Sequence, residues 1–335
     1  MKQTPSSYAP VIWLYITAAM VFAMALIGAI TRLTESGLSM AEWRPLMGAL
    51  PPLSEAEWQR VFDLYRNTPE FEKKHFWMEI EDFKRIFFWE WLHRLFGRMI
   101  GLVYALPLVF FWLKGMLPAH LKPRFLFILL LGGGQGLMGW YMVKSGLVDH
   151  PEVSHFRLAA HLGLAFIIFG FLIWTAQDVQ NIRKITAPRL LKIIGWGTFS
   201  LLAITMTWGA YVAGLDAGFV YNEFPTMGHG RIIPTELFHT SPAWYDLLTN
   251  PVSIQFLHRW LGISSAILVC VWAWIAYRTD IHIPETFLLP LIVILQIGLG
   301  IATLLTQVWL PLAVLHQAGA LCLIAVSISF LRKIS

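Results

Sequence analysis

The chain has 335 residues, of which 57% are hydrophobic and only 13% are charged, and its mean hydropathy is +0.61. A water-soluble domain of this size carries about 25% charged residues, so the composition excludes an ordinary soluble protein and indicates many membrane-spanning helices. The net charge of +5 is no sign of nucleic-acid binding, because in a membrane protein the distribution of basic residues mainly sets topology.

The N-terminal segment, residues 1–10, contains one basic residue and no cleavage signal. It is not rich in arginine and serine, so it resembles neither a secretory signal nor a mitochondrial presequence. We therefore expect a bacterial inner-membrane protein. The apolar stretch that follows is the first of several that are long enough to span a bilayer.

Apolar runs with this property recur to the end of the chain. We predict eight spans, at residues 11–31, 87–113, 125–143, 158–176, 193–213, 255–277, 287–306 and 312–331. Basic residues dominate the connections after the second and fourth spans, and Arg332 and Lys333 stand near the C-terminus. By the positive-inside rule these segments face the cytoplasm, so both termini are expected there.

The longest connection, residues 32–85, is expected on the outer side. Ser54 and Glu57 have the spacing of a capping box and predict a short helix that ends near Arg66. A second helix is expected to run from about Phe71 into the second span. Its many aromatic residues are interpreted either as an anchor at the membrane interface or as a lid over an outer-facing site.

The two halves of the sequence resemble each other. Glu90-Trp91-Leu92-His93-Arg94 returns as Gln255-Phe256-Leu257-His258-Arg259. Further matched pairs are Gly28-Ala29 with Gly209-Ala210, and Gln135-Gly136-Leu137-Met138-Gly139 with Gln296-Ile297-Gly298-Leu299-Gly300. We predict an all-α polytopic membrane protein built as two pseudo-symmetric four-helix bundles, residues 1–186 and 187–335.

Four histidines occupy matched places near the outer ends of the even-numbered spans: His93, His161, His258 and His316. Four residues after them come Gly97, Ala165, Gly262 and Ala320, which leave room for a flat ligand on the same helix face. Two imidazoles from facing helices can ligate haem iron, whereas zinc or copper usually needs further ligands. The alternative is that each histidine only bonds to a neighbouring helix.

The residues beside two of these histidines suggest different roles for the halves. Arg94 and Arg259 point away from the ligands and are candidates for pairing with haem propionates, although lipid phosphates are an alternative partner. Glu90 corresponds to Gln255, and a carboxylate can take a proton or stabilise positive charge where an amide cannot. We therefore expect chemistry in the N-terminal half and a bound redox cofactor in the C-terminal half. The alternative is that Glu90 only bonds to solvent or backbone.

At this point the chain resembles the haem A synthase family over nearly its whole length. The resemblance is carried by Gly28-Ala29-Ile30-Thr31-Arg32-Leu33-Thr34-Glu35-Ser36-Gly37-Leu38-Ser39, Trp43-Arg44-Pro45, the two histidine motifs quoted above, and His316-Gln317. It implies oxidation of the C8 methyl of haem O to the formyl group of haem A, via hydroxylated intermediates, for terminal oxidases. It also implies that His258 and His316 ligate a resident haem b, that His93 and His161 ligate the substrate haem, and that Glu90 is important for activity.

The resemblance further implies a setting and partners. The haem sites would lie toward the periplasmic side of the inner membrane, and haem O synthase would be a sensible transient partner beside the lipid bilayer. The electron acceptor is not identified, and a homo-oligomer is compatible with the sequence but not indicated by it. One bacterial branch of the family carries cysteine pairs in outer loops, whereas the two cysteines here, Cys270 and Cys322, lie within apolar runs.

Other functions use some of the same features. A dihaem b electron carrier of the quinol oxidoreductase type would use the same four histidines, but such proteins commonly hold their haems at two depths. A transporter can also have parallel repeats, yet the mid-span regions here are largely apolar. A prenyltransferase would need paired aspartate-rich motifs, which the sequence lacks.

Overall fold

The computed structural model describes the chain except for residues 1–7, 43–47, 49, 147–152 and 229, so the expected motif Trp43-Arg44-Pro45 lies outside the described residues. Among the described residues, eight helices are long and apolar enough to cross a membrane. They are α1 (Ala9–Leu33), α3 (Ile80–Leu113), α4 (Lys122–Gly146), α5 (His155–Val179), α6 (Arg189–Gly214), α8 (Pro251–Arg278), α9 (Pro284–Leu305) and α10 (Leu310–Ile334). The predicted all-α membrane fold with eight spans is confirmed.

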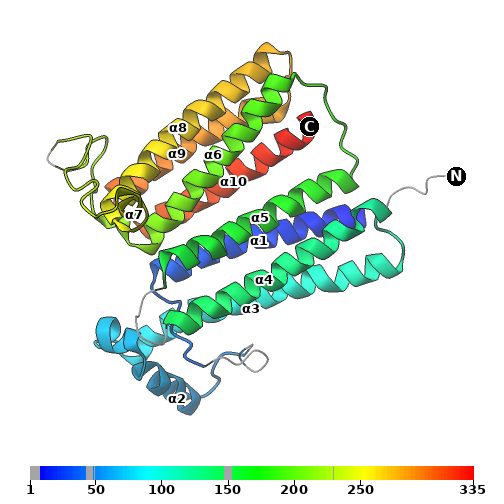
Figure 1. Ribbon diagram of the computed structural model, residues 1–335. Helices are drawn as coiled ribbons and strands as arrows, with labels where there is room; N and C mark the ends of the chain where they lie inside the picture. The colour runs from blue at the N-terminus through cyan, green and yellow to red at the C-terminus, as the bar shows by residue number, and fades with distance from the viewer. Residues whose placement is uncertain (1–7, 43–47, 49, 147–152, 229) are drawn as a thin grey trace.

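The spanning helices form two groups of four (Figure 1). Helices α1, α3, α4 and α5 pack together, as do α6, α8, α9 and α10. Each group contributes most of one apolar core, and the core of the first group also includes Leu321, Ile324 and Ile328 of α10. The start of α1 and the end of α10 lie at one end of the molecule, whereas the shorter helices α2 (Glu55–Arg66) and α7 (Ala243–Thr249) lie at the other. The end that carries α2 and α7 is called the outer end below.

The contact between the two groups follows the sequence repeat. Helix α1 packs on α10, α5 packs on α6, and α5 also packs on α10. The four central helices are therefore the first and last of each group, as a two-fold repeat requires. A Cβ atom built at Gly170 of α5 would lie only 2.6 Å from Cδ1 of Ile328 on α10, so glycine allows these two helices to approach closely.

Polar side chains join the groups at both ends. At the outer end, Arg32 donates to Asp216 at 3.0 Å, which links the last turn of α1 to the segment after α6. At the opposite end, Asp178 of α5 accepts hydrogen bonds from both Arg124 and Arg332. Because Arg332 belongs to α10, this partly buried ion cluster also connects the two groups.

Helix α3 extends far beyond a membrane. Its 34 residues correspond to about 51 Å, against about 30 Å for the hydrocarbon core of a bilayer. Its first turns pack against α2 through an outer, mainly aromatic cluster, which consists of Phe62, Tyr65, Phe83 and Phe87 together with Ile86. The predicted helix before Arg66 is confirmed, and Ser54 Oγ accepts from the Glu57 N–H at 3.2 Å as expected.

The expected continuous helix from Phe71 into the second span is wrong. A single turn, Phe71–His75, is followed by a break, and α3 begins only at Ile80. Glu79 adopts an extended backbone and its N–H donates to the Asp82 carboxylate at 3.4 Å, so a cap starts a new helix here. Phe76 and Trp77 are exposed in this break, whereas Phe83 is fully buried. The aromatic residues therefore divide between surface and core.

Candidate functional site

Four histidine side chains project from four helices near the outer end of the bundle. His161, His258 and His316 lie within the first eight residues of α5, α8 and α10. His93 lies further along α3. The first turns of α3 belong to the outer, mainly aromatic cluster, so His93 still lies near the outer end of the part of α3 that spans the membrane. The structure thus places all four predicted ligands at corresponding positions in the two halves.

Each histidine ring faces a glycine of another helix. A Cβ atom built at Gly28 of α1 would lie 3.2 Å from Cε1 of His93, and one at Gly209 of α6 would lie 2.9 Å from Cε1 of His258. Likewise, a Cβ atom built at Gly139 of α4 would lie 3.3 Å from Cε1 of His161, and one at Gly300 of α9 would lie 2.9 Å from Cε1 of His316. A side chain at any of these glycines would push on the ring, so we call the four glycines the ring seats.

The ring seats were not predicted as functional residues, although the sequence contains their signal. All four belong to motifs that recur between the halves. Sequence reasoning expected room for a flat ligand beside Gly97 and Gly262 instead. A Cβ atom at Gly97 would meet Met24 at 3.6 Å and one at Gly262 would meet Ile297 at 3.9 Å, which are ordinary contacts. The close approach to the rings therefore comes from neighbouring helices.

The ring nitrogens are largely left without partners inside the protein. Within the described part of the chain, Nδ1 of His93, His161 and His316 is buried without a hydrogen-bond partner. Nδ1 of His258 lies 3.1 Å from the Thr205 carbonyl oxygen. A backbone carbonyl at Nδ1 leaves Nε2 available as a metal ligand.

Two glutamines hold the helices that carry the second histidine of each half. Gln135 Nε2 donates to the His161 carbonyl oxygen at 3.1 Å, and Gln296 Nε2 donates to the His316 carbonyl oxygen at 2.9 Å. Gln135 Nε2 also lies 3.3 Å from His161 Nε2. These matched contacts fix α4 against α5 and α9 against α10, where the rings project.

The two histidines of the second half are brought together as a pair. The rings of His258 and His316 have centroids 6.4 Å apart and are nearly perpendicular, at 88°. His93 and His161 occupy the corresponding positions in the first half. No three His, Cys, Asp or Glu side chains gather as a metal site among the residues that can be described. Two facing imidazoles with unpartnered nitrogens fit the axial ligation of a haem.

Glu90 is buried, with 3% of its surface exposed, and is held by three donors. Its Oε1 accepts from the Arg94 guanidinium at 2.5 Å. Its Oε2 accepts from the Ser39 hydroxyl and from the Met40 N–H, both at 2.7 Å. The carboxylate therefore binds the segment that follows α1, and it is ion-paired as well as bonded to backbone.

Gln255 makes the corresponding contact in the second half. Its Nε2 donates at 3.0 Å to the carbonyl oxygen of Tyr221, which lies in the segment after α6. Arg259 donates to the same oxygen at 2.9 Å, much as Arg94 donates to the Met40 carbonyl oxygen at 3.2 Å. Each half thus fastens its first outer segment to the helix of its first histidine, and only the first half uses a carboxylate.

The two arginines proposed as propionate contacts therefore have protein partners. Arg259 also donates to the carbonyl oxygens of Glu223 and Thr226, at 2.8 and 3.0 Å. Arg94 remains 10% exposed at its side chain and is shared between Glu90 and Met40. Both cations lie one residue after a histidine at the outer end, so their charge is near any group bound there.

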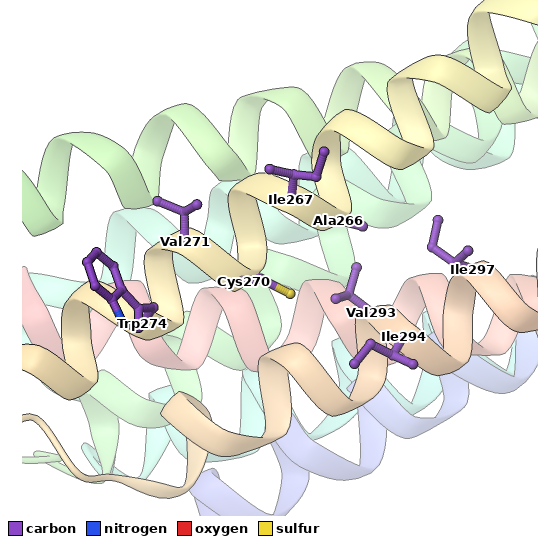
Figure 2. A pocket seen from close by; sticks show the side chains of 8 residues that line it. All are labelled: Ala266, Ile267, Cys270, Val271, Trp274, Val293, Ile294 and Ile297. Atoms are coloured by element: carbon purple, nitrogen blue, oxygen red, sulfur yellow. The ribbon is translucent and has the colours of Figure 1, made fainter.

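A groove of about 540 Å³ lies elsewhere, between α8 and α9. Figure 2 shows that aliphatic side chains and Trp274 line it, together with Cys270. Ala266, at one end of the groove, lies eight residues after His258, or about 12 Å further along α8. The groove offers no charged group to orient a ligand, so we do not assign the chemistry to it.

Comparison with known proteins identifies the family of the chain. Residues 11–328 match the sequence profile of the family described as cytochrome oxidase assembly protein. A heme A synthase of Rhodospirillum centenum is 49% identical over 320 residues, which cover 93% of this chain and 84% of the relative. Heme A synthases of Parvibaculum lavamentivorans and Maricaulis maris are 43% and 45% identical, and the matches cover 96% and 93% of this chain and 93% and 92% of those relatives.

Proposed function

The chain belongs to the heme A synthase family of cytochrome oxidase assembly proteins, and from this premise we propose that it oxidises haem O to haem A in the membrane. The reaction converts the C8 methyl of the substrate into a formyl group through hydroxylated intermediates. The product would serve terminal oxidases. The observation that carries the proposal is the pair of matched histidine sites of which only the first has a buried carboxylate in place of an amide.

The second half is proposed to hold the resident cofactor. His258 and His316 would bind a haem b, with Gly209 and Gly300 as their ring seats. The Thr205 carbonyl oxygen orients the His258 ring through Nδ1. When bound, the haem b supplies one-electron redox chemistry. An electron acceptor outside this chain would take the electrons onward.

The first half is proposed to bind the substrate. His93 and His161 would ligate the iron of haem O, and their ring seats Gly28 and Gly139 fix the ring orientation. Conversion of a methyl to a formyl group consumes one water and releases four electrons and four protons. The protein must therefore admit water, take up charge and release protons beside this pair.

Glu90 is proposed as the catalytic carboxylate. Arg94, Ser39 and Met40 all donate to it and hold it in one position. A carboxylate fixed in this way can stabilise positive charge at the reacting carbon. Gln255 cannot supply this charge, which fits a site in the second half that holds a cofactor without transforming it.

The protein is a multi-pass membrane protein, and its orientation follows from the charge distribution. Lys114, Lys122 and Arg124 lie at the end opposite α2 and α7, together with Arg332. We propose that this end faces the cytoplasm and that the histidine pairs face the periplasm. Haem O synthase is a fitting transient partner, because direct transfer would spare an apolar substrate from crossing water.

The proposal is tested by producing the protein with and without a co-expressed haem O synthase and separating the extracted haems chromatographically. We expect haem b alone without the synthase, and haem A or hydroxylated haem O with it. Haem b in both preparations, at about two per chain and with reversible redox spectra, would instead identify an electron carrier.

A further inference from the structure

A second polar cluster lies in the outer segment, away from the four histidines. It consists of Glu35, Tyr65, Glu70 and His75. Tyr65 is fully buried, and only 4% of Glu70 and 5% of His75 are exposed. Glu35, with 42% of its side chain exposed, connects the cluster to the surface. Buried titratable groups in such number need every hydrogen bond that they can make.

The four side chains form one hydrogen-bonded row. The Tyr65 hydroxyl lies 3.0 Å from Oε2 of Glu70 and 2.6 Å from Nδ1 of His75. On its other side, His75 Nε2 lies 3.2 Å from Oε2 of Glu35. The row thus contains three contacts, and each contact needs one proton between its two atoms.

Two proton arrangements satisfy all three contacts. In the first, a protonated Glu70 donates to Tyr65, Tyr65 donates to His75, and neutral His75 donates to Glu35. In the second, Tyr65 donates to an ionised Glu70, and a doubly protonated His75 donates to both Tyr65 and Glu35. Both arrangements hold the same number of protons, so one proton is shared between Glu70 and His75 through Tyr65.

Removal of that proton must break the row. An ionised Glu70, a neutral His75 and the Tyr65 hydroxyl together offer only two donor protons for three contacts. One contact then brings two acceptors together, which is repulsive in a buried site. The two remaining protons bond best to the two carboxylates, because hydrogen bonds to ionised acceptors are the stronger ones. The contact that fails is therefore the one between Tyr65 and His75, which separates His75 and Glu35 from Tyr65.

The row ends on the segment that holds Glu90. Glu35 has a left-handed backbone, with φ of +50°, and begins the turn that leads to Ser39 and Met40. These two residues donate to Glu90. The turn is compact, because the Ser36 N–H donates to the Thr31 carbonyl oxygen at 2.9 Å. A change at Glu35 is therefore transmitted over only five residues to the candidate catalytic carboxylate.

The surrounding charges decide when the shared proton leaves. Burial raises the pKa of Glu70 to about 7, and the negative charges of Glu90 and Glu35 act in the same direction. The hydrogen bond from His75 lowers the pKa of Glu35 to about 2, with help from Lys74 and Arg32. Glu70 is raised above its unfolded value, so its bonded form is present at low pH and is lost as pH rises through about 7.

We propose that Glu70, Tyr65 and His75 are positioning residues for Glu90. Their one shared proton keeps His75, and Glu35 bonded to it, fastened to the buried Tyr65, and it thereby holds Ser39 and Met40 against the carboxylate. This inference rests on the proposed function. It adds that the protonation state of the row in the outer segment controls the rate of the proposed reaction. Lys74 lies 3.6 Å from Glu35 and supplies a second, weaker attachment. The control therefore modulates the reaction and does not abolish it.

The direct test is the pH dependence of haem A formation by the full chain. The rate of the wild-type protein should fall as pH rises through neutrality. Glu70→Gln supplies a permanent amide donor to Tyr65, so this variant should keep its low-pH rate in alkaline solution. Since Glu90 acts in the chemical step, kcat should change while KM stays constant.

Removal of the Tyr65 hydroxyl interrupts the row at its centre. This variant should be slow at every pH, whereas Glu70→Gln should stay fast at every pH. Tyr65→Phe keeps the ring packed on Phe83 but removes the hydroxyl, so kcat should be about tenfold lower at every pH, as expected for a displaced catalytic group. The matched control is Tyr104→Phe. This change removes another buried tyrosyl hydrogen bond, to the Phe125 carbonyl oxygen, and should leave the rate and pH profile unchanged.

Amide hydrogen exchange of residues 36–40 reports the same control without turnover. Amide exchange rates rise with pH in any protein because hydroxide catalyses exchange, so the measured rates are divided by the intrinsic rates. The corrected rates of residues 36–40 should rise at alkaline pH in the wild-type protein but not in Glu70→Gln. Identical exchange and pH profiles in these two proteins, or a wild-type rate in Tyr65→Phe, would overturn the positioning role. If the wild-type protein makes no haem A at all, the proposed function fails, whereas the exchange result still decides whether the shared proton holds the segment.

Discussion

Glycine is the residue that most closely defines the haem sites proposed here. Each histidine ring faces one glycine of another helix, and the two closest approaches, at Gly209 and Gly300, are in the half proposed to hold haem b. A Cβ atom 2.9 Å from a ring carbon is too close for ordinary contact. The ring must then tilt, and its nitrogen leaves the position from which it can reach iron.

Gly209→Ala should therefore lose most of its haem b, because His258 is displaced. Gly197→Ala is a matched control on the same helix, since a Cβ atom at Gly197 meets nothing within 4 Å. Haem content per chain, measured as the pyridine haemochrome, should fall in the first variant alone. Equal haem content in the two variants would show that the ring seat has no role.

Glu90 is the second residue-scale test. Glu90→Gln should keep haem b but lower haem A formation by at least about 100-fold, because an amide cannot stabilise positive charge at the reacting carbon. Ser39→Ala removes one donor to Glu90 while the carboxylate stays, so its effect should be only a few-fold. Chromatography of extracted haems measures both. A normal haem A yield from Glu90→Gln would contradict the catalytic assignment.

The repeat in the sequence was sufficient to find the histidines but not what surrounds them. A single helix period shows which residues share a face, so small residues on the histidine helices were expected to border the rings. The ring seats lie on other helices, and their distance to the rings depends on helix packing. Likewise, the clamp on Glu90 depends on the path of the turn from Glu35 to Met40, which no local pattern specifies.

At the scale of elements, α2 and the first turns of α3 form a small outer unit with its own aromatic core. Phe83 is fully buried there, and its ring lies 5.1 Å from Phe62 and 5.2 Å from Tyr65 between centroids. This unit carries the row that ends on Glu35. Its packing should therefore affect the reaction without affecting the resident haem.

Phe83→Ala should expose α2 to local unfolding, because truncation of a buried phenylalanine costs about 3–5 kcal/mol. Phe88→Ala, on the same helix, removes a side chain that is 48% exposed and serves as the control. Limited proteolysis around α2 should accelerate only in Phe83→Ala, while the haem b spectrum stays unchanged. Loss of haem b from Phe83→Ala would show instead that the outer unit supports the whole bundle.

The sequence predicted the spanning helices because length and hydropathy alone mark them. It was wrong about the helix from Phe71, since the cap at Glu79 starts a new helix within a stretch of strongly helical composition. Local capping geometry is a weak signal beside a long aromatic run. The short helix before Arg66 was predicted correctly, because Ser54 and Glu57 give an unambiguous start.

At the scale of the whole molecule, two similar halves share an interface but differ in one decisive residue. Glu35 and its repeat counterpart Asp216 both adopt left-handed backbones, with φ of +50° and +51°, yet bind different partners. Asp216 pairs with Arg32 across the interface, whereas Glu35 pairs with His75 of the outer unit. The acidic residue of the second half thus connects it to the first half. The acidic residue of the first half connects it to the outer unit, which is proposed to regulate the reaction.

The division of labour between the halves is the central claim, and haem analysis of purified single-histidine variants, made with co-expressed haem O synthase, tests it most directly. His258→Ala and His316→Ala should lose haem b. His93→Ala and His161→Ala should keep haem b at the wild-type level yet form no haem A. Loss of haem b from the His93 and His161 variants, with haem b retained in the other two, would contradict the assignment of the halves.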